Sequence, residues 1–201
     1  MKTKLSTRDF VLLALLLAAL IVLGMVNIPQ PAGLSITFNM IPVAIAAIAL
    51  GYRGGAIIGG AFGLISFLQC FGICGYSGMG AALVAVSPVL SFIQRFVSRL
   101  IVGLLTALVF KLTADKLNFY VRCVLTGFSA AFLNTLFFMS ALVLLFGHTE
   151  YLQNLMAGRS VLAFIVASVG INAVVEMIVA AVLTGAIGAA LRKARLIPQE
   201  I

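Results

Sequence analysis

The sequence contains little charge, and acidic residues are especially scarce. Charged residues make up 9% of the 201 positions, with 5 Asp and Glu against 13 Lys and Arg, and there is no tryptophan. Hydrophobic residues make up 63%, whereas a soluble domain is about half apolar and about a quarter charged. This composition excludes an ordinary soluble domain and predicts an integral membrane protein.

The sequence also lacks a nucleotide-binding loop. No G-x-x-x-x-G-K-[ST] motif occurs in it, so the chain does not bind and hydrolyse ATP by that route. In a chain this apolar, an excess of basic residues indicates cytoplasmic loops, and nucleic acid is not expected as a partner.

Cysteine is scarce and odd in number, with 3 in the chain. Cys70 and Cys74 lie one helical turn apart near the end of an apolar run, without a neighbouring histidine. Small apolar packing residues are therefore favoured over a labile disulfide or a metal contact. We expect neither a metal site nor a cofactor in this chain.

The hydrophobic runs, divided by proline, glycine and charged residues, predict an all-α polytopic membrane protein with six transmembrane helices in one domain over residues 1–201. The first run follows a basic stretch, as in a signal peptide. It is long enough to span and has no small-x-small cleavage site, so a retained helix is favoured. The six predicted helices cover roughly 9–27, 36–51, 55–72, 82–110, 121–146 and 160–190.

The basic residues outside the helices predict the orientation. With the N-terminus inside, only Arg159 lies in an outer loop, and all the others lie on the cytoplasmic side. Both termini are therefore expected to be cytoplasmic. The cytoplasmic group consists of Lys2, Lys4, Arg8, Arg53, Lys111, Lys116, Arg122, Arg192, Lys193 and Arg195.

Three ionisable residues lie at membrane depth, where charge is expensive and function is the default interpretation. Arg95 and Arg99 have i, i+4 spacing and share a helical face. Glu176 lies at a depth comparable to Arg99, which predicts a structural ion pair between them. Arg95 is then left without an acid, so it either contacts an anionic ligand such as a carboxylate or lies against solvent or a carbonyl group.

Five polar residues on five predicted helices lie in the middle or outer half of the membrane. Each one alone most often bonds across helices. Together they predict a small-molecule pocket with a polar cluster inside an apolar shell. The predicted substrate-binding residues are Asn39, Gln69, Arg95, Asn134 and Asn172, with Phe38, Phe67, Phe71 and Tyr76 as possible aromatic walls.

Small residues recur every four positions on two helices. Gly51, Gly55, Gly59 and Gly63 form a smooth stripe, and Ala14 and Ala18 form a shorter one. Such stripes predict a face that another helix can approach closely, either within the chain or from a partner.

The whole chain resembles the substrate-binding S components of energy-coupling factor (ECF) vitamin transporters. The resemblance rests on the length, the six spans and an early A-x-x-x-A element. It also includes residues 36–43 (Ile-Thr-Phe-Asn-Met-Ile-Pro-Val), Gly51 with the glycine-rich third helix, and a set of polar positions in the later spans: Arg95 and Arg99 ahead of Gly103, Asn134-Thr135, and Asn172 with Glu176.

The resemblance implies a high-affinity capture subunit for a small water-soluble vitamin in a prokaryotic cell membrane. Such a subunit works with a transmembrane coupling subunit and two cytoplasmic ATPases, which would supply the energy that this chain cannot. Ala14 and Ala18 would then contact the coupling subunit. The pantothenate and riboflavin branches are the most similar, and an unpaired Arg95 favours the carboxylate of pantothenate.

Two other classes remain open. Residues 75–78 (Gly-Tyr-Ser-Gly) match the G-x-S-G motif of rhomboid intramembrane proteases, which would pair Ser77 with His148 as nucleophile and base. The same residues also suit a flexible loop over a pocket. A standalone proton-coupled secondary transporter is the other alternative, but it would normally show internal repeats and several titratable residues along a path.

Overall fold

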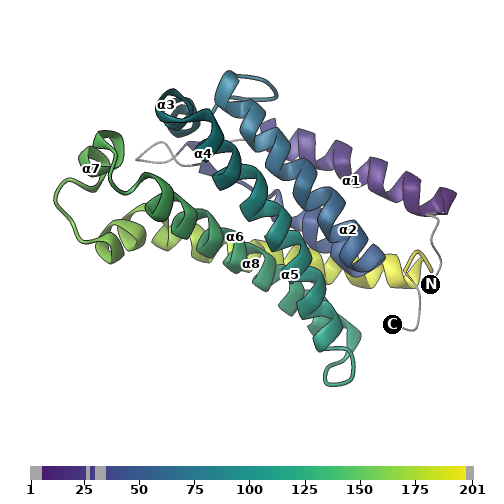
Figure 1. Cartoon of the computed structure of the whole chain (residues 1–201). Helices are drawn as coiled ribbons and strands as arrows, with labels where there is room; N and C mark the ends of the chain where they lie inside the picture. Colours follow the sequence, from purple (N-terminus) through teal and green to yellow (C-terminus); the bar gives the residue numbers. More distant parts are fainter. Residues whose placement is uncertain (1–5, 26–27, 30–34, 198–201) are drawn as a thin grey trace.

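The computed structural model describes residues 6–25, 28–29 and 35–197, and this part of the chain is almost entirely helical (Figure 1). The only strands among these residues are two short ones that pair as an antiparallel hairpin. The elements are α1 (Thr7–Met25), β1 (Ile28–Pro29), β2 (Ser35–Ile36), α2 (Met40–Leu68), a 3-10 turn η2 (Gln69–Phe71), α3 (Gly78–Val86), α4 (Pro88–Phe92), a π-helical segment η3 (Ile93–Val97), α5 (Ser98–Leu112), α6 (Phe119–Phe146), α7 (Glu150–Met156) and α8 (Val161–Lys193).

Five helical stretches among the described residues are long and apolar enough to cross a membrane. The expected class, an all-helical membrane protein, is therefore confirmed. The number of stretches differs from the six predicted because one of them covers both the second and the third predicted helix. The five are Thr7–Met25, Met40–Phe71, Pro88–Leu112, Phe119–Phe146 and Asn172–Lys193.

That long stretch is bent sharply at Gly51, where φ is 59° and ψ is −144°. Only glycine adopts such a backbone conformation at little cost. Both ends of α2 lie beside Gly24, since a Cβ built there would be 3.5 Å from Gln69 Nε2 and 3.6 Å from Asn39 Nδ2. A continuous helix of 29 residues would be about 43 Å long. The two halves of α2 therefore fold back on each other at Gly51, the last residue of the second predicted helix (36–51).

The predicted helix at 82–110 is divided in two. Ser87 is extended (φ −160°, ψ 112°), and its Oγ accepts a hydrogen bond from the Leu90 N–H while Pro88 begins the next helix. A serine N-cap followed by proline starts a helix efficiently. Residues 78–86 therefore form the short helix α3, which precedes the membrane stretch. The predicted loop at 147–159 contains another short helix, α7.

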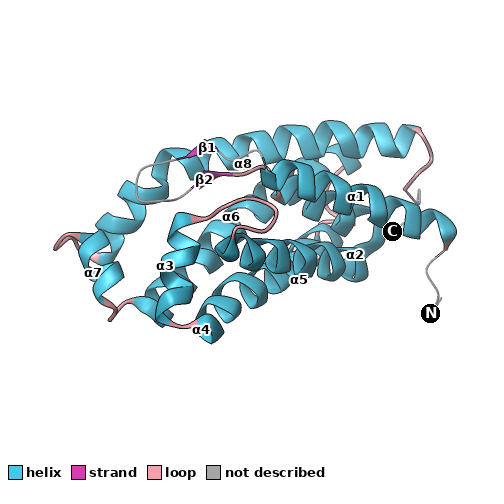
Figure 2. Cartoon of the chain, turned by 90° about the horizontal axis from the view of Figure 1, so that it is seen from above, coloured by secondary structure: helices cyan, strands magenta, loops and turns pink. Residues whose placement is uncertain are grey.

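The helices are packed so that one end of the bundle carries the short elements. In Figure 1, α3 and α7 lie at the end opposite the two chain termini. Viewed from above, the β1–β2 hairpin lies beside α8, toward the end of the bundle that carries α3 and α7 (Figure 2). The principal helix contacts join α2 to α5 and α6 to α8. This arrangement leaves the polar residues of five elements facing one another near the end with the short elements.

Candidate functional site

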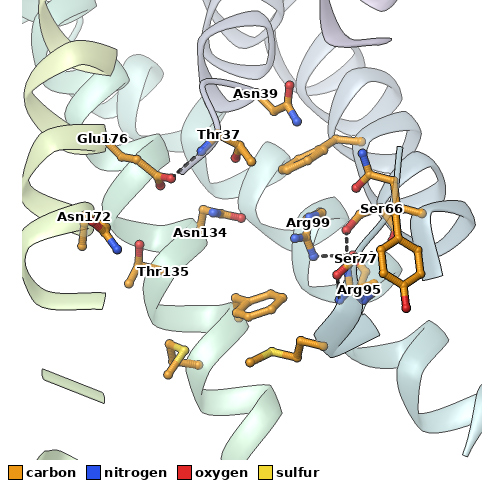
Figure 3. Close-up of a pocket in the computed structure, with 17 residues that line it drawn as sticks. Thr37, Asn39, Ser66, Ser77, Arg95, Arg99, Asn134, Thr135, Asn172 and Glu176 are labelled. Carbon is orange, nitrogen blue, oxygen red and sulfur yellow. Dashed lines mark hydrogen bonds between the residues drawn. The ribbon is translucent and has the colours of Figure 1, made fainter. Parts of the chain in front are cut away.

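A pocket lies between the segment just before α2, the second half of α2, the segment from η2 to α3, the η3–α5 helix, α6 and α8 (Figure 3). Its lining mixes charged, amide, hydroxyl and apolar side chains. The residues are Thr37, Asn39, Phe62, Ser66, Gln69, Tyr76, Ser77, Met79, Arg95, Arg99, Asn134, Thr135, Phe138, Met139, Asn172, Ala173 and Glu176.

The structure brings together all five residues that the sequence predicted for substrate binding. Asn39 precedes α2, Gln69 begins η2, Arg95 lies in η3, Asn134 in α6 and Asn172 in α8. Because they come from five separate elements, only the folded chain makes them neighbours.

Arg95 is almost fully buried, with 4% of its surface exposed, and it is held mainly by hydroxyl and carbonyl groups. Its Nη1 donates to Ser66 O at 3.1 Å and to Ser66 Oγ at 2.8 Å, and its Nη2 donates to Ser77 Oγ at 3.1 Å. Its Nε has no hydrogen-bond partner among the described residues. None of these partners is charged, so the arginine keeps an uncompensated positive charge at the pocket wall.

Arg99 is equally buried, and fewer of its donors are used. Its Nη1 donates to Arg95 O at 3.1 Å, while its Nε is buried and meets no acceptor in the described part of the chain. The guanidinium lies over Phe62, 4.5 Å from the ring centroid, and over Phe138 at 5.1 Å. A guanidinium has five N–H donors, and only one of those of Arg99 meets an acceptor among the described residues.

The predicted ion pair between Arg99 and Glu176 is not formed within the described part of the chain. Glu176 Oε1 instead accepts a hydrogen bond from the main-chain N–H of Thr37 at 2.8 Å. Figure 3 shows Arg99 and Glu176 on opposite sides of the pocket, with Asn134 between them. Counting residues along the two helices predicts a comparable depth for both residues, but their side chains lie on opposite walls of the cavity.

The amides divide into anchored and unanchored groups. Gln69 Nε2 donates to Gly24 O at 3.0 Å and to Cys74 O at 3.2 Å, so it ties the end of α1 to the loop after η2. Asn39 is 1% exposed, and no described residue donates to its Oδ1. Asn134 and Asn172 form no side-chain hydrogen bond with any described residue. The unanchored amides are therefore available to a ligand.

Glycines of α2 place the arginines at the pocket. A Cβ on Gly55 would lie 2.2 Å from Gly103 O, and one on Gly59 would lie 2.7 Å from Arg99 O. The predicted small-residue face is thus used inside the chain, by α5. The π-helical turn that carries Arg95 widens the helix, a local feature that is frequent at functional sites.

Sequence reasoning missed several lining residues. Phe62 and Phe138 supply the aromatic walls, and Ser66 is the hydroxyl that holds Arg95. Of the four predicted aromatic residues, only Tyr76 lines the pocket. A helical-face reading of α2 would have found two of the missed residues, since Phe62, Ser66 and Gln69 follow i, i+4, i+7 spacing.

The protease pair is not assembled. Ser77 Oγ caps α3 by accepting from the Gly80 N–H at 3.1 Å and also accepts from Arg95. His148 is exposed in the turn between α6 and α7 and does not line the pocket. A catalytic serine needs its base within hydrogen-bond reach, and here its neighbour is a cation.

The cysteines and the small residues of α1 lie outside the ligand-facing wall. Cys70 and Cys74 are free thiols, and the Cys70 thiol donates weakly to Ser66 O at 3.6 Å. Ala14 and Ala18 are both exposed on α1, whereas Leu13 on the same helix is buried in the core.

Taken together, the pocket combines two buried cations without a described acidic contact, unanchored amides and aromatic walls. Such a site suits a small molecule with an anionic end and further polar groups, held between aromatic rings. Nothing in it resembles a nucleophile with its base.

Comparison with known proteins gives consistent results. The sequence model of the family described as "ECF transporter, substrate-specific component" matches residues 8–188. The chain is 31% identical over 195 residues to the pantothenate transporter PanT of Leuconostoc mesenteroides, covering 93% of this chain and 91% of the relative. It is 29% identical over 206 residues to the pantothenic acid transporter PanT of Lactococcus lactis, covering 96% and 97% respectively.

Proposed function

This chain belongs to the family of ECF transporter substrate-specific components, and we propose that it captures pantothenate for import. The family resemblance identified from the sequence is confirmed, and the chain is a membrane transporter component rather than an enzyme. The names of the two relatives support pantothenate as the substrate. The observation that carries the proposal is the pair of buried arginines facing the pocket without a described acidic contact.

The substrate carboxylate binds between the two arginines in this proposal. Arg99 makes the main contact with the carboxylate, because its Nε and its Nη2 donate to no described residue. Arg95 already donates hydrogen bonds to Ser66 and Ser77. This shifts the emphasis from Arg95 alone, which the sequence favoured, to both residues. Charge-assisted hydrogen bonds of this kind are about twice as strong as neutral ones.

The rest of the substrate meets the other walls. Its apolar methyl groups pack near Phe62 and Phe138, and its amide and hydroxyl groups are within the reach of the unanchored Asn134 and Asn172. The predicted substrate-binding set of Asn39, Gln69, Arg95, Asn134 and Asn172 is retained, with Gln69 acting through the loop it anchors.

In the membrane, we propose six crossings with both termini in the cytoplasm of a prokaryotic cell. The fold-back of α2 at Gly51 supports six crossings from five apolar stretches. The basic loops support the orientation. The pocket then opens toward the outer surface, since the short elements around it lie opposite the termini (Figure 1).

The energy for import comes from partner subunits in this proposal. Because the sequence has no nucleotide-binding loop, a transmembrane coupling subunit and two cytoplasmic ATPases would provide ATP hydrolysis. The exposed Ala14 and Ala18 on α1 offer a smooth face for the coupling subunit. No cofactor or metal is required in this chain.

Native mass spectrometry tests the substrate directly. The protein is purified in mild detergent from cells grown in rich medium, and a retained molecule with the mass of pantothenate is expected. A flavin mass would keep the family and exclude the carboxylate argument in favour of the riboflavin alternative. An empty protein that also ignores added vitamins would favour a proton-coupled carrier.

Deletion of the coupling subunit or of the ATPases tests the partners. Uptake of labelled pantothenate should stop while binding to this chain persists. Uptake that continues without the ATPases would show a standalone secondary transporter instead.

A further inference from the structure

The pocket has an acidic side opposite its arginines. Glu176 lies on α8, four residues after Asn172, and lines the same cavity as Arg95 and Arg99. Within the described residues, no Lys or Arg side chain forms an ion pair with it, and only the Thr37 N–H donates to it. A half-buried carboxylate with so few donors is expensive to maintain unless a ligand supplies more.

The Thr37 bond fixes the direction of the carboxylate. It uses Oε1 at 2.8 Å and leaves Oε2 without a donor among the described residues. Because an ionised carboxylate accepts and never donates, Oε2 selects a ligand group that carries a proton, such as a hydroxyl. A second anionic group at this position would be repelled.

The opposite walls therefore impose a direction on the ligand. Its anionic end belongs beside Arg99 and its hydrogen-bond donors belong beside Glu176, with the aromatic rings of Phe62 and Phe138 nearer the arginines. Pantothenate has this polarity, since its carboxylate is at one end and its two hydroxyls are at the other.

We propose, on the basis of the proposed function, that Glu176 binds the hydroxyl end of the substrate and sets the orientation of the substrate in the pocket. Tight binding then requires the two hydroxyl groups. A site built to bond a hydroxyl rejects analogues that lack it, because its own polar group is then left unpaired. Glu176 is thus a specificity-determining residue, and its role does not depend on an ion pair with Arg99.

Calorimetric titration of two ligands against two proteins tests this. The ligands are pantothenate and its dideoxy analogue, which keeps the carboxylate, the amide and the methyl groups but lacks both hydroxyls. The proteins are the wild type and Glu176→Gln, which keeps an oxygen for the Thr37 N–H and removes the charge. Glu150→Gln, at an exposed position in α7 away from the pocket, is the matched control.

The wild type should bind the dideoxy analogue about 10- to 100-fold more weakly than pantothenate. Glu176→Gln should bind pantothenate about 10-fold more weakly and should bind the analogue as the wild type does. The control should match the wild type with both ligands. Glu176→Asp keeps the charge but shortens the side chain by one methylene, so it should also lose the difference in affinity between pantothenate and the analogue. This variant replaces Glu176→Gln if Glu176→Gln fails to fold.

The outcomes separate this inference from the proposed function. A wild type that binds neither ligand contradicts pantothenate as the substrate. A wild type that binds both equally leaves the proposed function standing and overturns the role of Glu176. If the wild type discriminates and the Glu176 variants discriminate equally well, another residue receives the hydroxyls and the inference is wrong.

Discussion

Arg99 donates a hydrogen bond from its Nη1 to the main-chain oxygen of Arg95 at 3.1 Å, one turn earlier on the same helix. Both also lie near the ring of Phe138, at 5.1 Å for Arg99 and 6.0 Å for Arg95. Two like charges near one ring repel each other in a medium of low dielectric constant. Under the proposed function, a bound carboxylate would relieve that repulsion.

Removing Arg99 should strongly weaken the binding of pantothenate. Arg99→Ala deletes a cation with at least two available donors, and charge-assisted bonds contribute about 1.5–3 kcal/mol each. We expect affinity to fall by about 100-fold or more in a titration of the detergent-solubilised protein. Arg159→Ala, in the exposed segment before α8, is the control and should bind normally. Retained affinity in a folded Arg99→Ala protein would exclude the carboxylate contact.

Arg95→Ala should abolish measurable binding while the fold is retained. The variant removes the second cation and also releases Ser66 and Ser77, which Arg95 joins at one wall of the pocket. Circular dichroism checks the fold, and titration measures the affinity. If affinity survives, Arg95 has a structural role only, and Arg99 alone recognises the anion.

Ser77→Ala should lower both stability and affinity because one hydroxyl serves two purposes. It caps α3 and accepts from Arg95, and loss of a serine N-cap costs about 0.5–2 kcal/mol. We expect a lower melting temperature and about 10-fold weaker binding. Ser77→Thr keeps the hydroxyl and should restore both. An affinity loss that threonine does not rescue would contradict this role.

Gly55→Ala should destabilise the protein, whereas Gly60→Ala on the same helix should not. A Cβ on Gly55 would lie 2.2 Å from Gly103 O, while the nearest atom to a Cβ on Gly60 is 3.6 Å away, an ordinary contact. Overpacking of this kind costs about 1–3 kcal/mol. Because α5 carries Arg99, affinity should fall together with the melting temperature. Equal melting temperatures for the two variants would contradict the close approach of α2 and α5.

A bulky residue at Ala14 or Ala18 should block transport and spare binding. Both positions are exposed on α1 and take no part in the pocket, so a substitution there affects only what docks on the helix. We expect Ala14→Phe or Ala18→Phe cells to lose uptake, while the purified proteins bind pantothenate normally. Val166→Phe, at an exposed apolar position on α8, is the control and should transport. Loss of ligand binding in a folded Ala14→Phe protein would contradict a docking role.

The sequence by itself determined the class of this protein and predicted five of the polar residues that meet in its pocket. Long apolar runs cannot be stable in water, and their backbone groups must be satisfied internally in a membrane, so helices follow from composition alone. Asn39, Asn134 and Asn172 stood out because polar groups at membrane depth are costly. The glycine stripe of residues 51, 55, 59 and 63 stood out for a different reason, because a smooth helix face predicts close contact with another helix.

Only the tertiary structure decided which of the two arginines keeps most of its hydrogen-bond donors for a ligand. Arg95 looked unpaired and Arg99 looked paired, yet Ser66 and Ser77 hold the first while the second keeps most of its donors. Depth along a helix can be counted from the sequence, but the direction in which a side chain points depends on how the helices are rotated and packed. Close contacts such as that between Gly55 and Gly103 set this rotation, and they join residues far apart in the chain.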